Sequence, residues 1–261
     1  MSVDPPPPRS VVVELCGLPG AGKSSLASAI GAMGDRLGVA FPTAGIAPDV
    51  PAGRRIARKL GLCSVETARR PALEATMIRQ IVRSGQPSPA GAVSRWVQWA
   101  STQSLMGRAR GVAGVHVFDE GVLQALWSLG LRGDPEATLR TLAASVGRWS
   151  SPDLVIVLDP PVELLAGRLR DRPSSHSRLQ RVSDDAELHA ELVVGRSLLE
   201  RLAVWWEAIA PVEASLVRMR GEHGDPGVAM DAIDAAVRRI EATTAGSYAV
   251  GRRRGGSKAG P

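Results

Sequence analysis

The stretch Ser10–Ser24, SVVVELCGLPGAGKS, decides the fold of this 261-residue chain. Its first seven residues form a short run rich in β-branched valine, which predicts a strand. The residues from Gly17 onward match the pattern G-x-x-x-x-G-K-[ST] at every fixed position. From Lys23 to Leu37 the apolar residues recur with helical spacing. The stretch therefore predicts a strand, a glycine-rich loop and a helix in succession.

The loop has the chemistry of a site for a nucleoside triphosphate, and we expect it to bind ATP with Mg²⁺. Glycines let successive backbone N–H groups face phosphate oxygens, and the helix that begins near Lys23 adds the positive end of its dipole. In this pattern Lys23 reaches the β- and γ-phosphates, and the hydroxyl of Ser24 binds Mg²⁺. The residues expected to contact the nucleotide are Gly17, Leu18, Pro19, Gly20, Ala21, Gly22, Lys23, Ser24 and Ser25.

Lysine is rare in this chain, which makes the match more specific. Of the 32 Lys and Arg residues, three are lysine (Lys23, Lys59 and Lys258) and 29 are arginine. Background composition therefore gives little chance of a lysine at the one position where the pattern demands it. A strand before the loop and a helix after it are also the context that the pattern requires. These observations favour a phosphate site over a glycine-rich turn without a ligand.

Strand- and helix-forming segments alternate along the chain, which predicts an α/β fold of the three-layer P-loop NTPase type, with helices on both faces of a parallel sheet and a small basic lid. We place this domain at residues 10–244, between a disordered proline-rich leader at 1–9 and a disordered basic tail at 245–261. Further strands are expected at 39–44 (weakened by Pro42), 114–118, 153–158 and 215–219. Helices are expected at 54–62, 66–83, 92–110, 120–129, 135–149, 161–172 and 227–242. A further long helix is expected to follow the polar stretch 173–185 and to end near residue 210.

The net charge of +6 does not indicate a nucleic-acid partner. Four of the cations lie in the glycine-rich tail, and removing them leaves +2: Arg252, Arg253, Arg254 and Lys258. Tails of this composition are more often solvated ends than binding segments. No stretch approaches 18 uncharged apolar residues, so we expect no membrane span and a cytoplasmic protein.

A predicted strand at 114–118, GVHVF, ends at Asp119-Glu120 and places carboxylates beside the loop. A P-loop site needs an acidic group near Mg²⁺, and the carboxyl ends of parallel strands share one edge of a sheet. We expect Asp119 to bind Mg²⁺ together with Ser24, and either Asp119 or Glu120 to accept a proton from an attacking hydroxyl or water. Capping the next helix is a compatible second role for Asp119.

Three arginines, Arg168, Arg170 and Arg172, follow the strand predicted at 153–158. Arg168 and Arg172 lie four residues apart on one helix face, where like charges repel mildly unless an anion lies between them. A triphosphate whose charge shifts during transfer would give the pair a catalytic role. The alternative is a solvated face in an arginine-rich chain. Two further arginines extend the basic run, Arg178 and Arg181.

Together these features resemble the thymidylate kinase branch of the P-loop nucleotide kinases. In that family a basic lid follows the fourth strand as hhLD-x-P-x-E-x-x-x-x-R-x-x-x-R, and the segment LDPPVELLAGRLRDR (158–172) is similar to it. The resemblance implies an ATP-dependent kinase with a small-molecule acceptor, a homodimer, and a lid at about 168–185 that closes over ATP and excludes water. The pattern falls on Leu158, Asp159, Pro161, Glu163, Arg168 and Arg172.

The expected acceptor pocket departs from that family at two places. The family has Asp-Arg where this chain has Asp119-Glu120, and an acidic-Arg pair where this chain has Ser101-Thr102-Gln103. A pocket with two cations fewer would hold a dianionic monophosphate poorly. We therefore expect a neutral or cationic acceptor with a hydroxyl, rather than thymidine monophosphate. The arginines that could compensate are Arg69, Arg70, Arg95 and Arg108.

Two questions stay open at this point. Asp119 and Glu120 also resemble the Walker B pair of a P-loop ATPase or switch protein, in which Glu120 would activate water. Against this alternative, the sequence gives no sign of a second domain for an ATP cycle to move. The second question is whether the tryptophans fill the core, which we favour, or line an aromatic pocket. They are Trp96, Trp99, Trp127 and Trp149.

Overall fold

The protein is described by a computed structural model, which covers residues 10–37, 51–131, 133–134, 136, 150–171, 178–211, 214–222 and 224–255. The strands are β1 (Ser10–Gly17), β2 (Gly114–Phe118), β3 (Leu154–Asp159) and β4 (Ser215–Arg220). The helices are α1 (Lys23–Leu37), α2 (Ala52–Arg69), α3 (Pro71–Arg83), α4 (Pro89–Ala109), α5 (Val122–Gly130), α7 (Val162–Asp171), the 3₁₀ helix η2 (Arg178–Arg181), α8 (Asp185–Ile209) and α9 (Pro226–Gly255). The strand predicted at 39–44 and most of the helix predicted at 135–149 lie outside the described residues.

Within the described residues, four strands form one parallel sheet in the order β2-β1-β3-β4. In the pairing of β1 with β2, Ser10 lies opposite Gly114. In the pairing of β1 with β3, Val13 lies opposite Leu154. Residues 11–17 of β1 are all buried, since strands flank β1 on both sides and helices cover both faces. This arrangement confirms the predicted α/β fold class with a parallel sheet.

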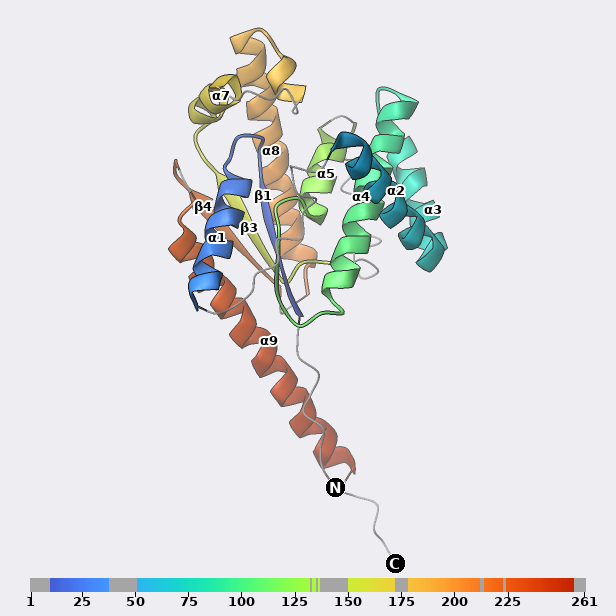
Figure 1. The fold of residues 1–261 in the computed structure, drawn as a ribbon, viewed down its shortest axis with the longest axis vertical. Coiled ribbons are helices and arrows are strands. Elements are labelled where there is room, and N and C mark those ends of the chain that lie inside the picture. Colours follow the sequence, from blue (N-terminus) through green and yellow to red (C-terminus); the bar gives the residue numbers. More distant parts are fainter. Residues whose placement is uncertain are drawn as a thin grey trace, which may run out of the picture.

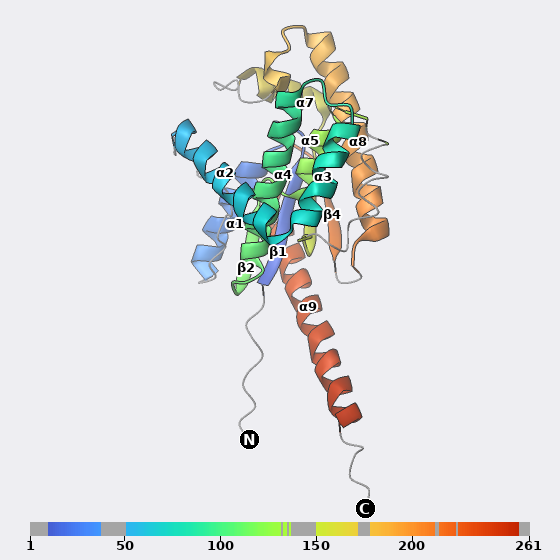
Figure 2. The same ribbon diagram turned by 90° about the vertical axis from the view of Figure 1, so that its right-hand side faces the viewer.

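Helices cover the two faces of the sheet (Figure 1). On one face α1 and α9 pack against each other and against β1, and α9 also contacts β3. On the other face α4 and α5 contact β1, and α8 contacts β4. α2 and α3 pack against α4 on the side away from the sheet (Figure 2).

The strands all end at the same edge of the sheet, because they are parallel, and loops of chemical interest follow them. The glycine-rich loop follows β1, Asp119 and Glu120 follow β2, α7 follows β3, and Glu222 follows β4. β1 has β2 on one side and β3 on the other, so the connections leave its end in opposite directions. Such a switch point is where ligands bind in open α/β sheets.

The predicted boundary between two helices at 54–62 and 66–83 is wrong. α2 continues without a break to Arg69, and the interruption falls at Arg70, whose φ of −137° and ψ of 57° are not helical. The residue before a proline is disfavoured in the helical region, while Pro71 itself suits the first position of α3. The proline therefore determines the boundary.

α9 extends to Gly255, although we placed the end of the domain at residue 244 and expected a disordered tail after it. Residues 245–255 continue this helix. No proline follows Pro226 until Pro261, and the single glycines Gly246 and Gly251 do not interrupt the helix. α9 thereby projects beyond the sheet, past the edge at which the strands begin (Figure 1). None of the described helices is long and apolar enough to cross a membrane.

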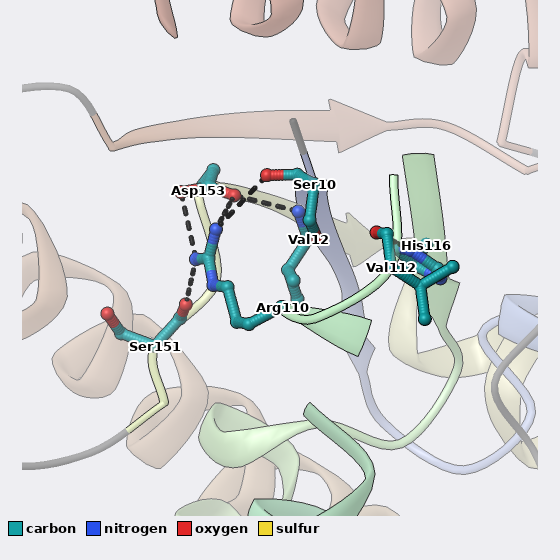
Figure 3. A network of polar contacts seen from close by, with 7 residues as sticks. All are labelled: Ser10, Val12, Arg110, Val112, His116, Ser151 and Asp153. Atoms are coloured by element: carbon teal, nitrogen blue, oxygen red, sulfur yellow. Dashed lines mark hydrogen bonds and ion pairs between the residues drawn. The ribbon is translucent and has the colours of Figure 1, made fainter. Parts of the chain in front are cut away.

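An arginine–aspartate network joins the starts of β1 and β3 at the edge opposite the glycine-rich loop (Figure 3). The Asp153 carboxylate accepts hydrogen bonds from Arg110 at 2.6 and 2.9 Å and from the backbone N–H of Val12 at 2.7 Å. Arg110 also donates to the backbone oxygens of Ser151 and Ser10, at 2.6 and 3.4 Å. The paired guanidinium and carboxylate thus connect the end of α4 to two central strands.

Replacing Asp153 with alanine is expected to lower the free energy of unfolding by about 2–3 kcal/mol, since the Val12 N–H and Arg110 each lose a charged partner. Chemical denaturation measures this change. The matched control is Glu207→Ala, which removes an ion pair whose carboxylate is 49% exposed and should cost less than about 1 kcal/mol. Equal losses in the two variants would contradict the structural role of Asp153.

Candidate nucleotide and acceptor site

The glycine-rich loop has the backbone that the sequence pattern predicts. Gly20 and Gly22 have φ values of +87° and +93°, which residues with a side chain rarely adopt. The loop is closed by a hydrogen bond of 3.1 Å from Ala21 N–H to the Leu18 oxygen. α1 begins directly afterwards at Lys23, so the N–H groups of its first turn lie at the loop. This is the geometry of an anion-binding helix start.

Two cations contact the loop from different elements. The Lys23 ammonium donates to the backbone oxygens of Gly17 at 2.7 Å and Leu18 at 3.2 Å. Arg168 on α7 donates to the Gly20 oxygen at 3.3 Å and to the Glu222 oxygen at 2.7 Å. Of the arginines predicted after β3, Arg168 therefore does lie at the loop.

The remaining arginines of that run have other positions. Arg170 pairs with Asp185 at 2.6 Å and also donates to the backbone of residues 182 and 183, so it ties α7 to the start of α8. Arg172 and the side chains of Arg178 and Arg181 lie outside the described part of the chain. The predicted pairing of Arg168 with Arg172 thus stays a prediction.

Ser24, in the first turn of α1, and Asp119, directly after β2, lie side by side. The Ser24 hydroxyl is 3.2 Å from an Asp119 carboxylate oxygen, although 95 residues separate them. A hydroxyl and a carboxylate are hard oxygen donors of the kind that Mg²⁺ takes beside phosphate and water, so the pair fits this ion. Glu120 is exposed at the same place.

A cavity of about 1160 Å³ opens beside the loop. One part of its wall includes the glycine-rich loop, Asp119, Glu120 and Arg168. Another part comes from α2, α4 and α5, which contribute both apolar and polar side chains. Ligand pockets usually measure about 300–1,000 Å³, so this cavity is large enough for a small-molecule ligand.

The buried carboxylate of Glu14, which the sequence did not single out as functional, holds this edge together. Glu14 lies inside β1 with no exposed surface, and its Oε1 accepts a 2.9 Å hydrogen bond from the N–H of Gln124 at the start of α5. Burial raises the pKa of Glu14 from its ordinary 4.5 to about 7, against the lowering by backbone N–H groups and by Lys23. A charged residue inside an otherwise apolar strand is the sequence signal that could have indicated it.

Gln124 and Gly121 complete the contact between β1 and α5. The Gln124 side-chain oxygen accepts from the N–H of Gly17 at 3.3 Å, at the first residue of the loop. Gly121 has no room for a side chain, because a Cβ there would lie 2.2 Å from the Glu14 carboxyl carbon. Asp119 and Glu120 precede this glycine, so the close approach places them beside Ser24.

Several residues expected at the acceptor do not reach the cavity. Ser101, Thr102 and Gln103 are 4%, 7% and 0% exposed, belong to the buried face of α4 and are not part of the cavity wall. Of the four compensating arginines, Arg95 is in the wall, whereas Arg69, Arg70 and Arg108 are not. Residues 101–103, at which the sequence was compared with the family, therefore lie on the buried face of α4 and do not line the pocket.

The tryptophans are mainly structural, as favoured from the sequence. Trp99 is 2% exposed in the core, and the Trp96 ring N–H donates to Glu74 at 2.7 Å. Trp127 is 4% exposed and donates to the Gly195 oxygen at 2.8 Å, but one part of it also faces the cavity. Trp149 lies outside the described residues.

No protein-family model matches the sequence, and no curated protein matches it. Among solved structures the chain is similar to deoxyadenosine kinase from M. mycoides, with bound dCTP, with the products dCMP and a flexible dCDP, and with bound dATP. The TM-scores are 0.47, 0.47 and 0.45 at 12% sequence identity, over 86–87% of this chain and 99–100% of the kinase. At this distance the similarity carries no activity or residue role over to this chain.

Replacing Gly121 with alanine is expected to lower stability by about 1–3 kcal/mol, because the new methyl group overlaps the Glu14 carboxyl. Thermal unfolding measures the loss. Gly167→Ala is the matched control, since a Cβ at this exposed helical position meets nothing within 4 Å and should stabilise by up to about 1 kcal/mol. Unchanged stability of the Gly121 variant would show that Glu14 does not approach this closely.

The raised pKa of Glu14 predicts a pH-dependent stability. Between pH 4.5 and about 7 the folded protein holds a proton that the unfolded chain has released, so stability falls as the pH rises through this window. Over the full window the loss is about 3 kcal/mol, which Glu14→Gln should lack. Urea unfolding of both proteins from pH 4.5 to 8 tests this, and parallel curves would contradict the buried titration.

Proposed function

We propose that this protein is an ATP-dependent phosphotransferase that moves the γ-phosphate of ATP to a hydroxyl group of a small acceptor. The observation that carries the proposal is the contact between Ser24 and Asp119 at the glycine-rich loop, inside a cavity that continues beyond the loop. The loop and this pair account for Mg·ATP, and the rest of the cavity gives the acceptor a place. The resemblance of the sequence to thymidylate kinases agrees with this assignment.

In this proposal the phosphates lie against the loop residues 17–25. Backbone N–H groups of the loop and the first turn of α1 donate to them, and Lys23 and Arg168 neutralise the charge that develops on the transferred group. Ser24 and Asp119 would hold Mg²⁺, which would offset the negative charge of the phosphates when bound.

Glu120 is the proposed proton acceptor. Asp119 is engaged with Ser24, whereas Glu120 is exposed and belongs to the same cavity wall, to which α2 and α4 also contribute. A carboxylate at this position can take the proton of an acceptor hydroxyl as it attacks. We propose a hydroxylated metabolite other than thymidine monophosphate as the acceptor, because Glu120 stands where the thymidylate kinases have an arginine.

The proposed lid at 168–185 contributes two groups to the cavity wall, Arg168 and the buried Leu179. The ion pair between Asp159 and Arg196, at 2.7 and 2.8 Å, fixes the end of β3, directly before α7, to α8. In the proposal the lid closes over ATP on this fixed base and excludes water from the phosphates.

A P-loop ATPase or switch protein is the second candidate, because Asp119 and Glu120 lie together at the cavity like a Walker B pair. The two functions differ in what consumes ATP. ADP formation measured with and without a panel of hydroxylated metabolites and nucleoside monophosphates separates them. Acceptor-dependent ADP formation supports the phosphotransferase, and steady hydrolysis that no acceptor changes supports the ATPase. Rapid turnover of thymidine monophosphate would refute the proposed acceptor class.

Replacing Lys23 with alanine is expected to raise the Kd for Mg·ATP by about 10- to 100-fold, since charged hydrogen bonds to phosphate are lost. Isothermal calorimetry measures it. Arg58→Ala, which removes an exposed cation outside the cavity wall, should leave the Kd unchanged. An unaltered Kd in the Lys23 variant would refute the nucleotide site.

Substitutions at Asp119 and Glu120 are expected to have different effects. Asp119→Asn should raise the Mg²⁺ concentration needed for half-maximal rate, because a metal-binding oxygen loses its charge. Glu120→Gln should keep the Mg²⁺ requirement and lower kcat by about 10²- to 10⁴-fold, as expected for loss of a general base. Steady-state rates across a Mg²⁺ titration decide this, and the reverse pattern would exchange the two roles.

A further inference from the structure

We propose that the acceptor carries an anionic group, and that Lys59 on α2 and Arg95 on α4 bind this group in the part of the cavity that these two helices line. The inference rests on the proposed function, because it assigns the acceptor half of the same cavity. It also replaces the expectation of a neutral or cationic acceptor, whose premise was a shortage of cations in the pocket.

Lys59 is the first of the two groups. It is half-buried in the cavity wall, and within the described part of the chain it has no hydrogen bond or ion pair. Besides Lys23 and Lys258 it is the only lysine, so the two lysines of the domain both line one cavity. An anionic ligand in the cavity could therefore pair with this ammonium by a charge-assisted hydrogen bond.

Arg95 is the second group, and it comes from the neighbouring helix. α2 packs against α4, and both Lys59 and Arg95 belong to the wall of the cavity between these helices and the loop. Arg95 donates one hydrogen bond of 2.9 Å to Gln98, which also lines the cavity and fixes the guanidinium. The planar guanidinium has five N–H donors, in a geometry that matches a carboxylate or a phosphate.

The charges of the cavity wall are unbalanced toward positive. Among the residues that the structure describes, its cations are Lys23, Lys59, Arg95 and Arg168, and its carboxylates are Asp119 and Glu120. Lys23, Arg168 and Asp119 belong to the nucleotide part, where phosphate and Mg²⁺ account for them. The buried carboxylates of Glu66 and Glu74, on α2 and α3, are not part of the wall. The acceptor part therefore favours a negative ligand by charge complementarity.

The wall beside Lys59 is apolar. Lys59 and Leu60 lie three and four residues after Ile56 on α2, which is the spacing of one helix face. Ile56 and Leu60 line the cavity, although they are 60% and 49% exposed. Val97 and Leu131 line the cavity from α4 and the end of α5. The wall thus suits a ligand with an apolar body and one anionic group, in addition to the hydroxyl that receives the phosphate.

The test uses simple probes of this chemistry on the full chain saturated with Mg²⁺ and a non-hydrolysable ATP analogue. Benzoate, phenyl phosphate and benzyl alcohol share an apolar ring and differ in charge. Calorimetry should detect at least one of the two anions, with at least about tenfold lower affinity for benzyl alcohol, and the anion that binds more tightly tells a carboxylate from a phosphate. Binding of neither anion, or equal binding of benzyl alcohol, would overturn the inference.

Substitutions assign the effect to the two side chains. Lys59→Met and Arg95→Met keep the length and remove the charge, and each should weaken anion binding by at least about tenfold, while Lys59→Arg should retain it. Arg58→Ala on α2 and Arg108→Ala on α4 are the controls, since both cations are exposed and outside the wall. Unchanged affinity in both Met variants would refute the site.

The outcome is separable from the proposed function. Binding of the ATP analogue is measured in the same samples, and its failure would refute the nucleotide site without bearing on Lys59. If the analogue binds and neutral acceptors are phosphorylated as well as anionic ones, the phosphotransferase stands and the anionic acceptor does not.

Discussion

The site depends on one buried hydrogen bond, from the N–H of Gln124 to the carboxylate of Glu14. It joins the central strand β1 to the start of α5, while the Gln124 side chain accepts from Gly17 at the first residue of the glycine-rich loop. The start of the glycine-rich loop and the start of α5 are thereby both attached to Glu14 and Gln124. Because Gly121 lets the chain pass close to Glu14, Asp119 meets Ser24. Burial of the Glu14 carboxylate away from water disfavours its charged form, and this raises the pKa of Glu14.

The cavity divides into two parts with different chemistry. At the loop, Lys23 and Arg168 contact backbone oxygens, and the Ser24 hydroxyl lies beside the Asp119 carboxylate, where we propose that phosphate and Mg²⁺ bind. Elsewhere in the wall, α2 and α4 contribute Lys59 and Arg95 beside apolar side chains, and we propose that these two cations select the acceptor. Glu120 belongs to the same wall, and we propose it as the proton acceptor. A phosphotransferase needs such a group, because the acceptor hydroxyl must lose its proton beside the transferred phosphate.

Local sequence signals predicted the elements whose pattern is strong and unopposed. The helix from Lys23 to Leu37 has the predicted bounds, and β1 differs from its prediction by one residue at Gly17. Predictions failed where a single residue overrode the pattern or where no stop signal existed. Pro71 places the break between α2 and α3 at Arg70, and α9 extends to Gly255, beyond its predicted end at 242, with no proline to end it. Glu14 went unassigned because its partner on α5 is 110 residues away.

The sequence by itself determined the phosphate loop, since its glycines, its lysine and the start of a helix are neighbours along the chain. The turn forms from the backbone preferences of those few residues and needs no distant partner. Only the tertiary structure decided which side chains line the cavity. Ser101, Thr102 and Gln103 lie on the buried face of α4. Arg95, about two turns earlier on α4, and Lys59 on α2 line the cavity. That choice follows from how helices pack against one another, which periodicity within one helix cannot specify.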